Sequence, residues 1–508
     1  MSTPTPASTP APPALDTDNS VRSVLRSPRR LRTEALAGLV VALALIPEAI
    51  AFSVIVGVDP RVGLFTSVIM AISIAFLGGR PAMISASTAA VGVVVAPVMK
   101  EYGYDHLVAT VMLGGLFQML MAFAGVAKLM RFIPRSVMVG FLNALATLVL
   151  LSQFDHVIDV PWQVYPLVAL GLVVILGFGR ITQVVPAPLV GVVVVTLVCV
   201  LANIEVPTVG DQGKMPDSLP EIFIPDVPLD LETFKVIAPY AFAMAIVGLL
   251  ESLLTAKLVD DITDTGSNKS REAFGQGCAN LLAGLFGGQG GCAVVGQTMM
   301  NVKNSGARTR VSTFLTGLWL LVLVIGLADV VAEIPMAGLV AVMIIVAFTA
   351  FDWHSITPAT LKRMPKSETF VMLCTVVLTL ATHNLAIGVG GGTLVAMVLF
   401  ARRVSHMTAT KRSLRRDLSG GDQSEYAHYR VTGQLFFASS NDLYTQFDYA
   451  GDPARVVIDL SQANVWDASS VAALDGIEAK YASRGKQVTI VGLDEASAAR
   501  HGRLTGTL

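Results

Sequence analysis

The stretch AIVGLLESLLTAKLVDD (residues 245–261), followed by GQGCANLLAGLFGGQGGCAVVGQTMMNVKNSGARTR (residues 275–310), places a carboxylate and a broken helix inside an apolar part of the chain. Glu251 lies within an apolar run of membrane-spanning length. The next apolar segment ends in glycines before a short helix-like piece begins. In lipid, an ionisable side chain and an interrupted helix both cost free energy, and proteins keep them where they bind something. The pattern therefore predicts a binding site within residues 240–310.

The composition is typical of a membrane protein with many spans. Of the 508 residues, 53% are hydrophobic and 14% are charged, whereas globular domains have about 25% charged residues. Basic and acidic residues nearly balance, at 36 and 37, so no excess of positive charge favours nucleic-acid binding. The cysteines lie in apolar segments without metal-ligand spacing, which indicates buried packing residues: Cys199, Cys278, Cys292 and Cys374.

Apolar runs recur along the chain and predict a polytopic α-helical protein with fourteen transmembrane segments within residues 31–405. Crossing a bilayer takes about 20 helical residues, and the third and tenth runs are shorter. The predicted ranges are 34–57, 62–79, 86–100, 106–127, 134–152, 161–179, 183–203, 238–258, 273–287, 292–302, 310–331, 334–351, 368–384 and 386–404. Residues 1–30, which begin with a segment rich in Pro, Ser, Thr and Ala, predict a disordered cytoplasmic tail.

The basic residues of the loops predict how these segments are oriented in the cytoplasmic (inner) cell membrane. Arginines precede the first segment, so the positive-inside rule predicts a cytoplasmic N-terminus. With that orientation, most basic loop residues fall inside, and the predicted outer loops hold only Arg61, Lys100, Lys214 and Lys235. The longest predicted outer loop, about 204–237, is acidic and rich in proline, as expected of an extracellular connector between two halves.

The chain changes character after the last apolar run. The basic stretch RRVSHMTATKRSLRR leads into residues 406–425, which predict a basic cytoplasmic linker; contact with anionic lipid is a further interpretation. Residues 426–508 alternate strand-like segments such as ARVVIDLSQ with helix-like segments such as WDASSVAALDGIEAKYASRG. This alternation predicts a small α/β domain in the cytoplasm.

Two motifs recur at nearly the same spacing in the two halves. Glu48, in LIPEAIAFSVI, and Glu251, in LLESLLTAKLV, are 203 residues apart (251 − 48). STAAVGV and GCAVVGQ match at Ala89 and Ala293, which are 204 residues apart (293 − 89). The match predicts a duplicated unit of seven segments, about 34–203 and 238–404. Because seven is odd, the two copies must have opposite orientations, which makes an inverted repeat.

The short third and tenth segments then predict two half-helices that start near the middle of the bilayer. A helix N-terminus carries roughly half a positive charge and unpaired N–H groups, so two that face each other bind an anion without any Lys or Arg. Gly287, Gly288, Gly290 and Gly291 suit a non-helical entry where backbone approaches a ligand closely. Tight helix packing is the alternative reason for these glycines.

The two intramembrane acids predict coupling to a cation. Glu48 and Glu251 lie too far from the ends of their segments to reach water easily; a neutral, hydrogen-bonded packing carboxyl is the alternative interpretation. An anion beside a carboxylate needs compensation, either by Na⁺ or by a proton on the carboxyl group. Glu251 and Thr255 have the i, i+4 spacing that allows both to contact one small cation.

At these residues the chain resembles the SulP (sulfate permease) family, related to the SLC26 anion transporters. The resemblance covers about residues 30–508 and rests on ALIPEAIAF, which ends at Phe52, and on ISASTAA (84–90), ESLLTA (251–256), FGQGCANLLAGLFGG (274–288) and a C-terminal domain that resembles STAS domains. It implies the seven-plus-seven fold shared with uracil-type transporters, in which a core domain of segments 1–4 and 8–11 moves like an elevator against a gate domain. It also implies a homodimer.

The resemblance implies a substrate site made of Glu48, Phe52, Ser87 and Thr88, together with backbone N–H groups of Cys292, Ala293 and Val294. It also implies Na⁺ coordination by Glu251 and Thr255, as in bicarbonate-transporting relatives. Gln297 stands where many members of the family have an arginine, so selectivity for sulfate or chloride does not transfer directly. In the STAS-like domain, Ser469 of DASS occupies the place of a phosphorylatable serine, and helix capping is the alternative role.

These patterns predict a secondary active transporter for a small anion (sulfate, bicarbonate or a dicarboxylate), coupled to Na⁺ or H⁺. A nucleobase–proton symporter of the same fold and a passive anion channel or uniporter remain as alternatives. A membrane enzyme is disfavoured, since no paired nucleophile and histidine and no metal cluster is evident in the sequence.

Overall fold

The computed structural model describes residues 20–128, 133–181, 185–213, 218–228, 230–382, 384–405, 408–416 and 425–506. Residues 1–19 of the predicted tail, and residues 406–407 and 417–424 of the predicted linker, lie outside the described residues. The chain divides into two compact units, an N-terminal unit of residues 1–393 and a C-terminal unit of residues 394–508. Residues 20–30 differ from the predicted disordered tail, because α1 (Val21–Arg26) and the start of α2 lie there.

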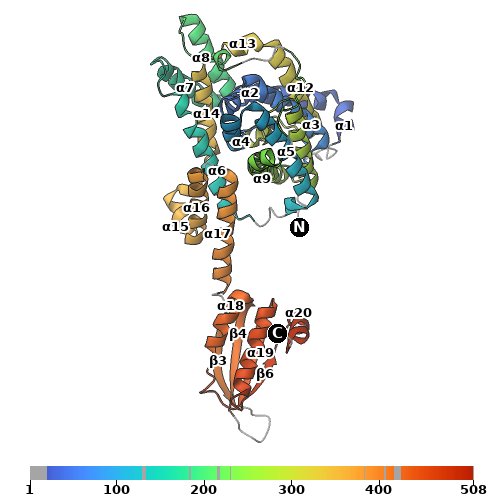
Figure 1. Ribbon diagram of the computed structural model, residues 1–508, viewed down its shortest axis with the longest axis vertical. Helices are drawn as coiled ribbons and strands as arrows, with labels where there is room; N and C mark the ends of the chain where they lie inside the picture. The colour runs from blue at the N-terminus through green and yellow to red at the C-terminus, as the bar shows by residue number, and fades with distance from the viewer. Residues whose placement is uncertain are drawn as a thin grey trace, which may run out of the picture. The chain divides into compact units, whose positions relative to one another are not determined.

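The N-terminal unit is helical, and each of the fourteen predicted apolar ranges overlaps one of its helices or α17 (Figure 1). In the first half these are α2 (Pro28–Val56), α3 (Pro60–Leu77), α4 (Ala89–Tyr102), α5 (Tyr104–Phe123), α6 (Arg135–Leu151), α7 (Val164–Ile181) and α8 (Ala187–Ala202). In the second half they are α9 (Leu231–Thr263), α10 (Lys269–Leu285), α11 (Val295–Met299), α12 (Arg310–Gly326), α14 (Met336–Ala350), α16 (Lys366–Thr382) and α17 (Leu385–Ser405).

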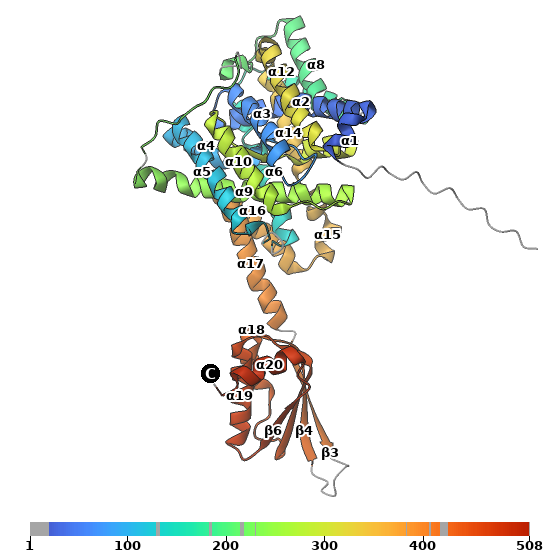
Figure 2. The same cartoon turned by 90° about the vertical axis from the view of Figure 1, so that its right-hand side faces the viewer.

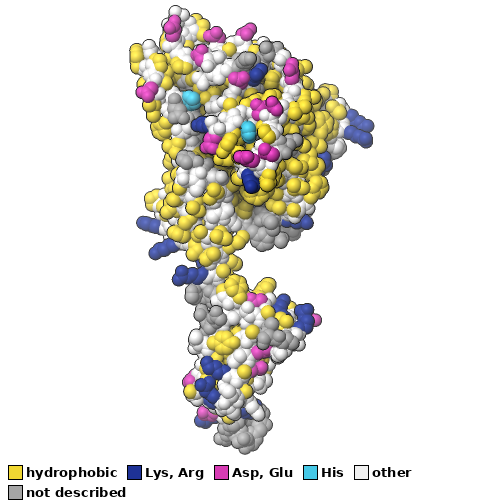
Figure 3. Space-filling model, in the orientation of Figure 1, with side chains coloured by type: hydrophobic (Ala, Val, Ile, Leu, Met, Phe, Trp, Pro, Cys, Tyr) yellow, Lys and Arg dark blue, Asp and Glu magenta, His cyan; other side chains and the backbone are white. Residues whose placement is uncertain are grey.

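Several of these helices are long and apolar enough to cross a membrane. Among the described residues they are α2, α3, α5, α9 and α17, and shorter apolar helices include α6, α7, α8, α12 and α14. Hydrophobic side chains also cover most of the face of this unit that is drawn in Figure 3. Among the large hydrophobic residues of this unit, Phe123, Val173 and Leu201 are each more than two-thirds exposed. So much exposed apolar surface is expected of a protein that lies in lipid.

The two halves of the unit meet in a short antiparallel strand pair. Strand β1 (Ser85–Ser87) precedes α4, and β2 (Gly291–Ala293) precedes α11. In this pair Ser87 lies opposite Gly291, which is 204 residues further along the chain (291 − 87). The matched motifs of the sequence have the same offset, and an antiparallel pair of strands has a local two-fold axis, so corresponding residues of the two halves face each other at this pair.

The strand pair requires glycine at position 291. A Cβ atom there would lie 2.0 Å from the backbone oxygen of Ala86. Helices α5 and α10 pack side by side (Figure 2) with the same kind of close approach, because a Cβ at Gly277 would lie 2.6 Å from the backbone oxygen of Gly115. Small residues that bring backbones together are typical of helix packing in membranes.

Charged groups fix the C-terminal end of α3, from which β1 follows. Arg271 and Arg310 donate hydrogen bonds to backbone carbonyls between Ala75 and Gly78. The carboxylate of Glu272 accepts the N–H groups of Gly79 and Arg80, at 2.7 and 2.9 Å. Cations are stabilising at the C-terminus of a helix, where unpaired carbonyls gather. These bonds hold α3, α10 and α12 together as one body.

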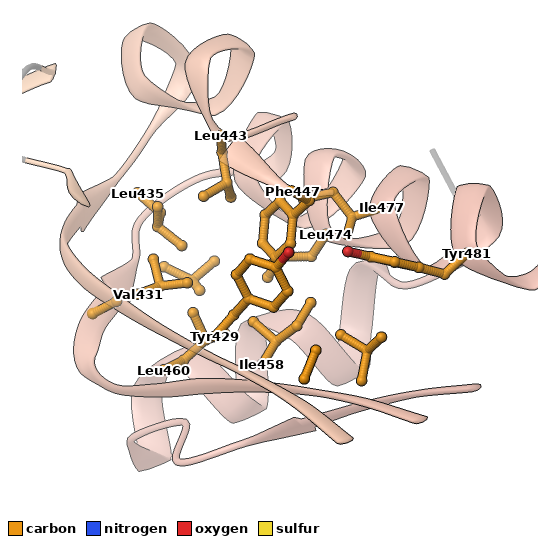
Figure 4. Packing of buried hydrophobic residues seen from close by; sticks show 14 of the residues in the cluster. Tyr429, Val431, Leu435, Leu443, Phe447, Ile458, Leu460, Leu474, Ile477 and Tyr481 are labelled. Atoms are coloured by element: carbon orange, nitrogen blue, oxygen red, sulfur yellow. The ribbon is translucent and has the colours of Figure 1, made fainter. Parts of the chain in front are cut away.

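The C-terminal unit is a mixed four-stranded sheet with helices packed against it. The strand order is β3 (Ala409–Arg416), β4 (Glu425–Leu435), β5 (Arg455–Val465) and β6 (Gln487–Val491); only the β3–β4 pair is antiparallel. The helices are α18 (Phe437–Leu443), α19 (Ala468–Ala482) and α20 (Glu495–Leu504). Tyr429, Ile458, Leu474 and Tyr481 belong to its buried core (Figure 4).

Two features of this unit were not anticipated. Residues 409–416, predicted as part of a linker, form the edge strand β3. Its Arg412 reaches the buried carboxylate of Asp452 at 2.7 Å, and the hydroxyls of Tyr429 and Tyr481 donate to the same carboxylate at 2.7 and 2.6 Å. Burial raises the pKa of the Tyr481 hydroxyl, and its bond to Asp452 raises it further.

Candidate functional site

The candidate site lies where two helices begin beside the β1–β2 pair. Helix α4 begins at Ala89 after its cap Thr88, whose hydroxyl accepts from the Val91 N–H at 3.4 Å. Helix α11 begins at Val295, and its cap residue Val294 makes no side-chain capping bond. First-turn N–H groups of a helix have no intrahelical acceptor. Both halves of the chain therefore aim helix N-termini at the strand pair.

Side chains from three helices hold the strand pair in place. Asn280 of α10 clamps Gly291, since its Oδ1 accepts the Gly291 N–H at 2.8 Å and its Nδ2 donates to the Gly291 carbonyl at 3.0 Å. Ser67 of α3 accepts the N–H of Ser87 at 3.1 Å, and Ser252 of α9 accepts the N–H of Ala293 at 3.0 Å. All these polar side chains are buried, so each bond stabilises the crossing.

These bonds change which N–H groups can meet an anion. The resemblance implied Cys292, Ala293 and Val294 as donors. In the structure the N–H of Ala293 is bonded to Ser252, and that of Val294 is bonded to the carbonyl of Ile84 at 2.9 Å. The first-turn donors of α11 lie one step later, at residues 295–297. At Gly296, which is exposed, a Cβ atom would meet nothing within 4 Å.

A hydrogen-bonded chain joins Glu251 to the start of α4. The thiol of Cys292 lies 2.9 Å from Oε2 of Glu251 and 3.1 Å from Oγ1 of Thr88. Thr88 and Cys292 are again 204 residues apart, so the local two-fold relates them. Thr255 is fully buried, and its hydroxyl donates to the backbone carbonyl of Glu251 at 2.8 Å.

The other predicted residues are also buried in the N-terminal unit. The side chain of Gln297 lies beside the carboxyl group of Glu48, so the residue in the place of the arginine neighbours the acid of the other half. Phe52 lies one turn after Glu48 on α2 and is buried. The hydroxyl of Ser87 accepts a hydrogen bond from the amide of Gln289. Glu48 and Ser87 of the first half therefore each lie beside a glutamine of the second half.

A cleft of about 400 Å³ opens between α2, α4 and α6. On α2 the lining includes Ile55, and on α4 it consists of Val93, Ala96, Pro97, Lys100 and Glu101. Ile55 lies about one turn beyond Phe52, on the helix that carries Glu48. The cleft therefore runs along the helices that carry the predicted residues, with Lys100 at the end of α4.

Ser469 belongs to the C-terminal unit and is exposed at the second position of α19. The helix cap is Asp467, which accepts the N–H of Ser470 at 3.0 Å, so capping is not the role of Ser469 itself. Phosphorylation of Ser469 stays a prediction.

Sequence reasoning assigned no role to the residues that brace the crossing. Asn280 lies in the quoted motif FGQGCANLLAGLFGG, and Gln276 lies one turn before it, bonded to Ser85 at 2.7 Å. Polar amides at i, i+4 in the otherwise apolar part of α10 after Glu272 were the available signal, because such groups need partners in lipid. Their partners Ser85 and Gly291 lie on the two paired strands, which spacing along one helix does not reveal.

Comparison with known proteins agrees with this architecture. The model of the sulfate permease family matches residues 31–166 and 159–375, and that of the STAS domain matches residues 423–506. The putative sulfate transporter YbaR of Bacillus subtilis is 45% identical over 92% of this chain and 95% of its own length. The bicarbonate transporter BicA of Picosynechococcus is 26% identical over 91% of this chain and 89% of its own.

Solved structures show the same fold. The structure of SLC26A9 matches with a TM-score of 0.78 at 16% identity, over 95% of this chain and 88% of that one. The transmembrane domain of a cyanobacterial BicA matches with a TM-score of 0.64 at 23% identity, over 73% of this chain and 98% of that one.

Proposed function

The chain belongs to the sulfate permease family of anion transporters and carries a C-terminal STAS domain, and from that premise we propose that it is a secondary active transporter coupling a small anion to Na⁺ or H⁺. The observation that carries the proposal is the crossing itself. Two helix N-termini meet there beside a hydrogen-bonded chain from Thr88 through Cys292 to Glu251.

The anion is proposed to lie against the first turns of α4 and α11, beside Gly296. Backbone N–H groups and two helix dipoles favour a negative charge there. Gln297 contributes no charge, so the attraction depends on these dipoles and on a co-bound cation. Sulfate, bicarbonate and a dicarboxylate all present oxygen atoms to such donors.

The cation is proposed to bind at Glu251, with Thr255 as a second oxygen ligand. A carboxylate and an anion in one low-dielectric site repel each other strongly, and a cation or proton on the carboxyl group removes that repulsion. The same ion then favours binding of the anion. Because the bound cation favours binding of the anion, the two ions are moved together.

The larger movement is proposed to be elevator-like, with fourteen segments arranged as two inverted repeats. The local two-fold at Ser87 and Gly291 supports the inversion. The bonds that join α3, α10 and α12 support a core that moves as one body. A homodimer in the inner cell membrane, with the STAS domain in the cytoplasm, completes the proposal.

Uptake by the purified full chain in proteoliposomes tests this function. Radiolabelled sulfate, bicarbonate and a dicarboxylate are offered with and without a Na⁺ gradient, at two pH values. Accumulation against a gradient that depends on the cation is expected, and Glu251→Gln should abolish the cation dependence while the protein remains folded. Equilibration without accumulation would instead indicate a passive channel or uniporter. Full cation-dependent uptake by Glu251→Gln would refute the assignment of Glu251.

A further inference from the structure

We infer that the side chain of Cys292 transmits occupation of Glu251 by a cation to the anion-binding end of α4. The inference rests on the proposed function and deepens it. It assigns a positioning role to a thiol, where the resemblance used only the backbone of this residue. The two contacts at 2.9 and 3.1 Å carry the argument, because they join an acid on α9 to the cap of α4 through one sulfur atom.

The direction of each hydrogen bond follows from the chemistry of the three groups. An ionised carboxylate is only an acceptor, so the single hydrogen of the Cys292 thiol points to Glu251. The sulfur then acts as acceptor for the hydroxyl hydrogen of Thr88. The single hydroxyl hydrogen of Thr88 is thus donated to the sulfur, while the hydroxyl oxygen accepts from the Val91 N–H. In this state Thr88 has no hydrogen to offer an anion.

A cation at Glu251 reverses this order. It occupies the carboxylate oxygens and repels the positive end of the S–H bond, so the thiol hydrogen turns to the oxygen of Thr88. The hydroxyl hydrogen of Thr88 is then free to point at an anion beside the first turn of α4. Both hydrogens rotate about their own C–S and C–O bonds, and no proton changes its atom. The cation therefore creates one additional anion donor.

The packing around Cys292 keeps the thiol between its two partners. The residue is fully buried, and Ser252 holds the next residue of β2 through its backbone. A Cβ atom on Gly248 of α9 would lie 3.6 Å from the Cβ of Cys292 and 2.8 Å from Nε2 of Gln118, a buried nitrogen without a hydrogen-bond partner.

Equilibrium binding to the purified full chain separates this role from a purely structural one. The probe is the radiolabelled anion that the wild-type protein accumulates, measured with Na⁺ and with choline in its place at constant pH. Na⁺ should tighten anion binding by about 10-fold or more, the gain from one hydrogen bond to a charged group. In Cys292→Ala this ratio should fall about 10-fold, to the part that direct electrostatics between cation, carboxylate and anion supplies, while anion binding itself persists.

Three further variants and a control keep the test falsifiable. Cys292→Ser retains a small donor and acceptor and should restore the wild-type ratio, and Thr88→Val should show the same reduced ratio as Cys292→Ala. The double variant Cys292→Ala/Thr88→Val should lose no more than either single variant, because both interrupt one chain. Cys278→Ala removes a thiol on α10 that is only partly buried and should behave as wild type.

The outcomes distinguish the inference from the function on which it rests. If Cys292→Ala keeps the wild-type ratio, the relay is refuted while cation coupling stands. If the ratio of anion affinities in Na⁺ and choline fell in Cys292→Ser as much as in Cys292→Ala, altered packing would be the cause, and the relay would also be refuted. A wild-type protein that binds the anion equally well with Na⁺ and choline would refute Na⁺ coupling, and the inference with it.

Discussion

Replacing Gly296 with alanine tests where the anion lies. Gly296 is the second residue of α11, and the Cβ of a helical residue tilts toward the helix N-terminus. The new methyl group would therefore point at the space proposed for the anion. It would meet no protein atom within 4 Å, so the substitution requires no rearrangement of the fold.

The expected effects on stability and on transport have opposite signs. Alanine is a better helix former than glycine by about 1 kcal/mol, so the free energy of unfolding should hold or rise slightly. The methyl group keeps the anion from a first-turn N–H donor. A hydrogen bond to a charged group contributes about 1.5–3 kcal/mol, which corresponds to roughly 10- to 150-fold weaker anion affinity.

Uptake kinetics in proteoliposomes, with thermal unfolding in detergent, measure both effects. Gly390→Ala on α17 is the matched control, because a Cβ there also meets nothing within 4 Å and α17 carries none of the predicted site residues. Gly296→Ala should raise KM by the expected factor, and Gly390→Ala should leave KM unchanged. A wild-type KM in well-folded Gly296→Ala would refute the placement of the anion against α11.

Three further substitutions test other parts of the structure. Gly291→Ala brings a methyl group within 2.0 Å of the Ala86 carbonyl oxygen, so it should separate the strand pair and abolish uptake; normal uptake would contradict this geometry. Asp452→Ala leaves two tyrosine hydroxyls and Arg412 without their shared acceptor, and should cost the C-terminal unit about 3–5 kcal/mol in chemical denaturation, with Asp452→Asn milder. If Asp452→Ala and Asp452→Asn both kept the wild-type free energy of unfolding, the Asp452 carboxylate would not be the group that stabilises this unit. Burial lowers the pKa of His428 from its ordinary value of 6.5, so the folded state binds fewer protons than the unfolded state, and stability should fall as pH drops below that value. His428→Gln should flatten that part of the profile, and an unchanged slope would exclude His428 as its source.

The sequence predicted much of the helical framework because each apolar run can be recognised from its own residues. The repeat can be recognised from the nearly constant spacing between matching motifs. The match of Ala89 with Ala293 anticipated an offset that the structure repeats in the pairing of Ser87 with Gly291. The sequence did not predict that the N–H groups of Ala293 and Val294 already donate hydrogen bonds within the protein. Their acceptors, Ser252 and the Ile84 carbonyl, come from elements distant in the chain, and spacing within one motif carries no information about them.

The edge strand of the C-terminal sheet escaped prediction for a different reason. ATKRSLRR has almost no apolar residues, and nearly all of its side chains are exposed. It lacks the alternation of buried and exposed positions that indicates a strand. Its place in the sheet depends on backbone pairing with β4 and on the contact of Arg412 with Asp452, which composition does not encode.

The position of β3 has a practical consequence for fragments of this protein. The STAS family match begins at residue 423, yet the sheet begins at Ala409, four residues after α17 ends at Ser405. A fragment cut at the family boundary would lack β3 and expose a row of unpaired backbone groups along β4. Such an edge is a template for self-association. It would also uncover the Asp452 carboxylate, so a soluble fragment should start no later than the end of α17.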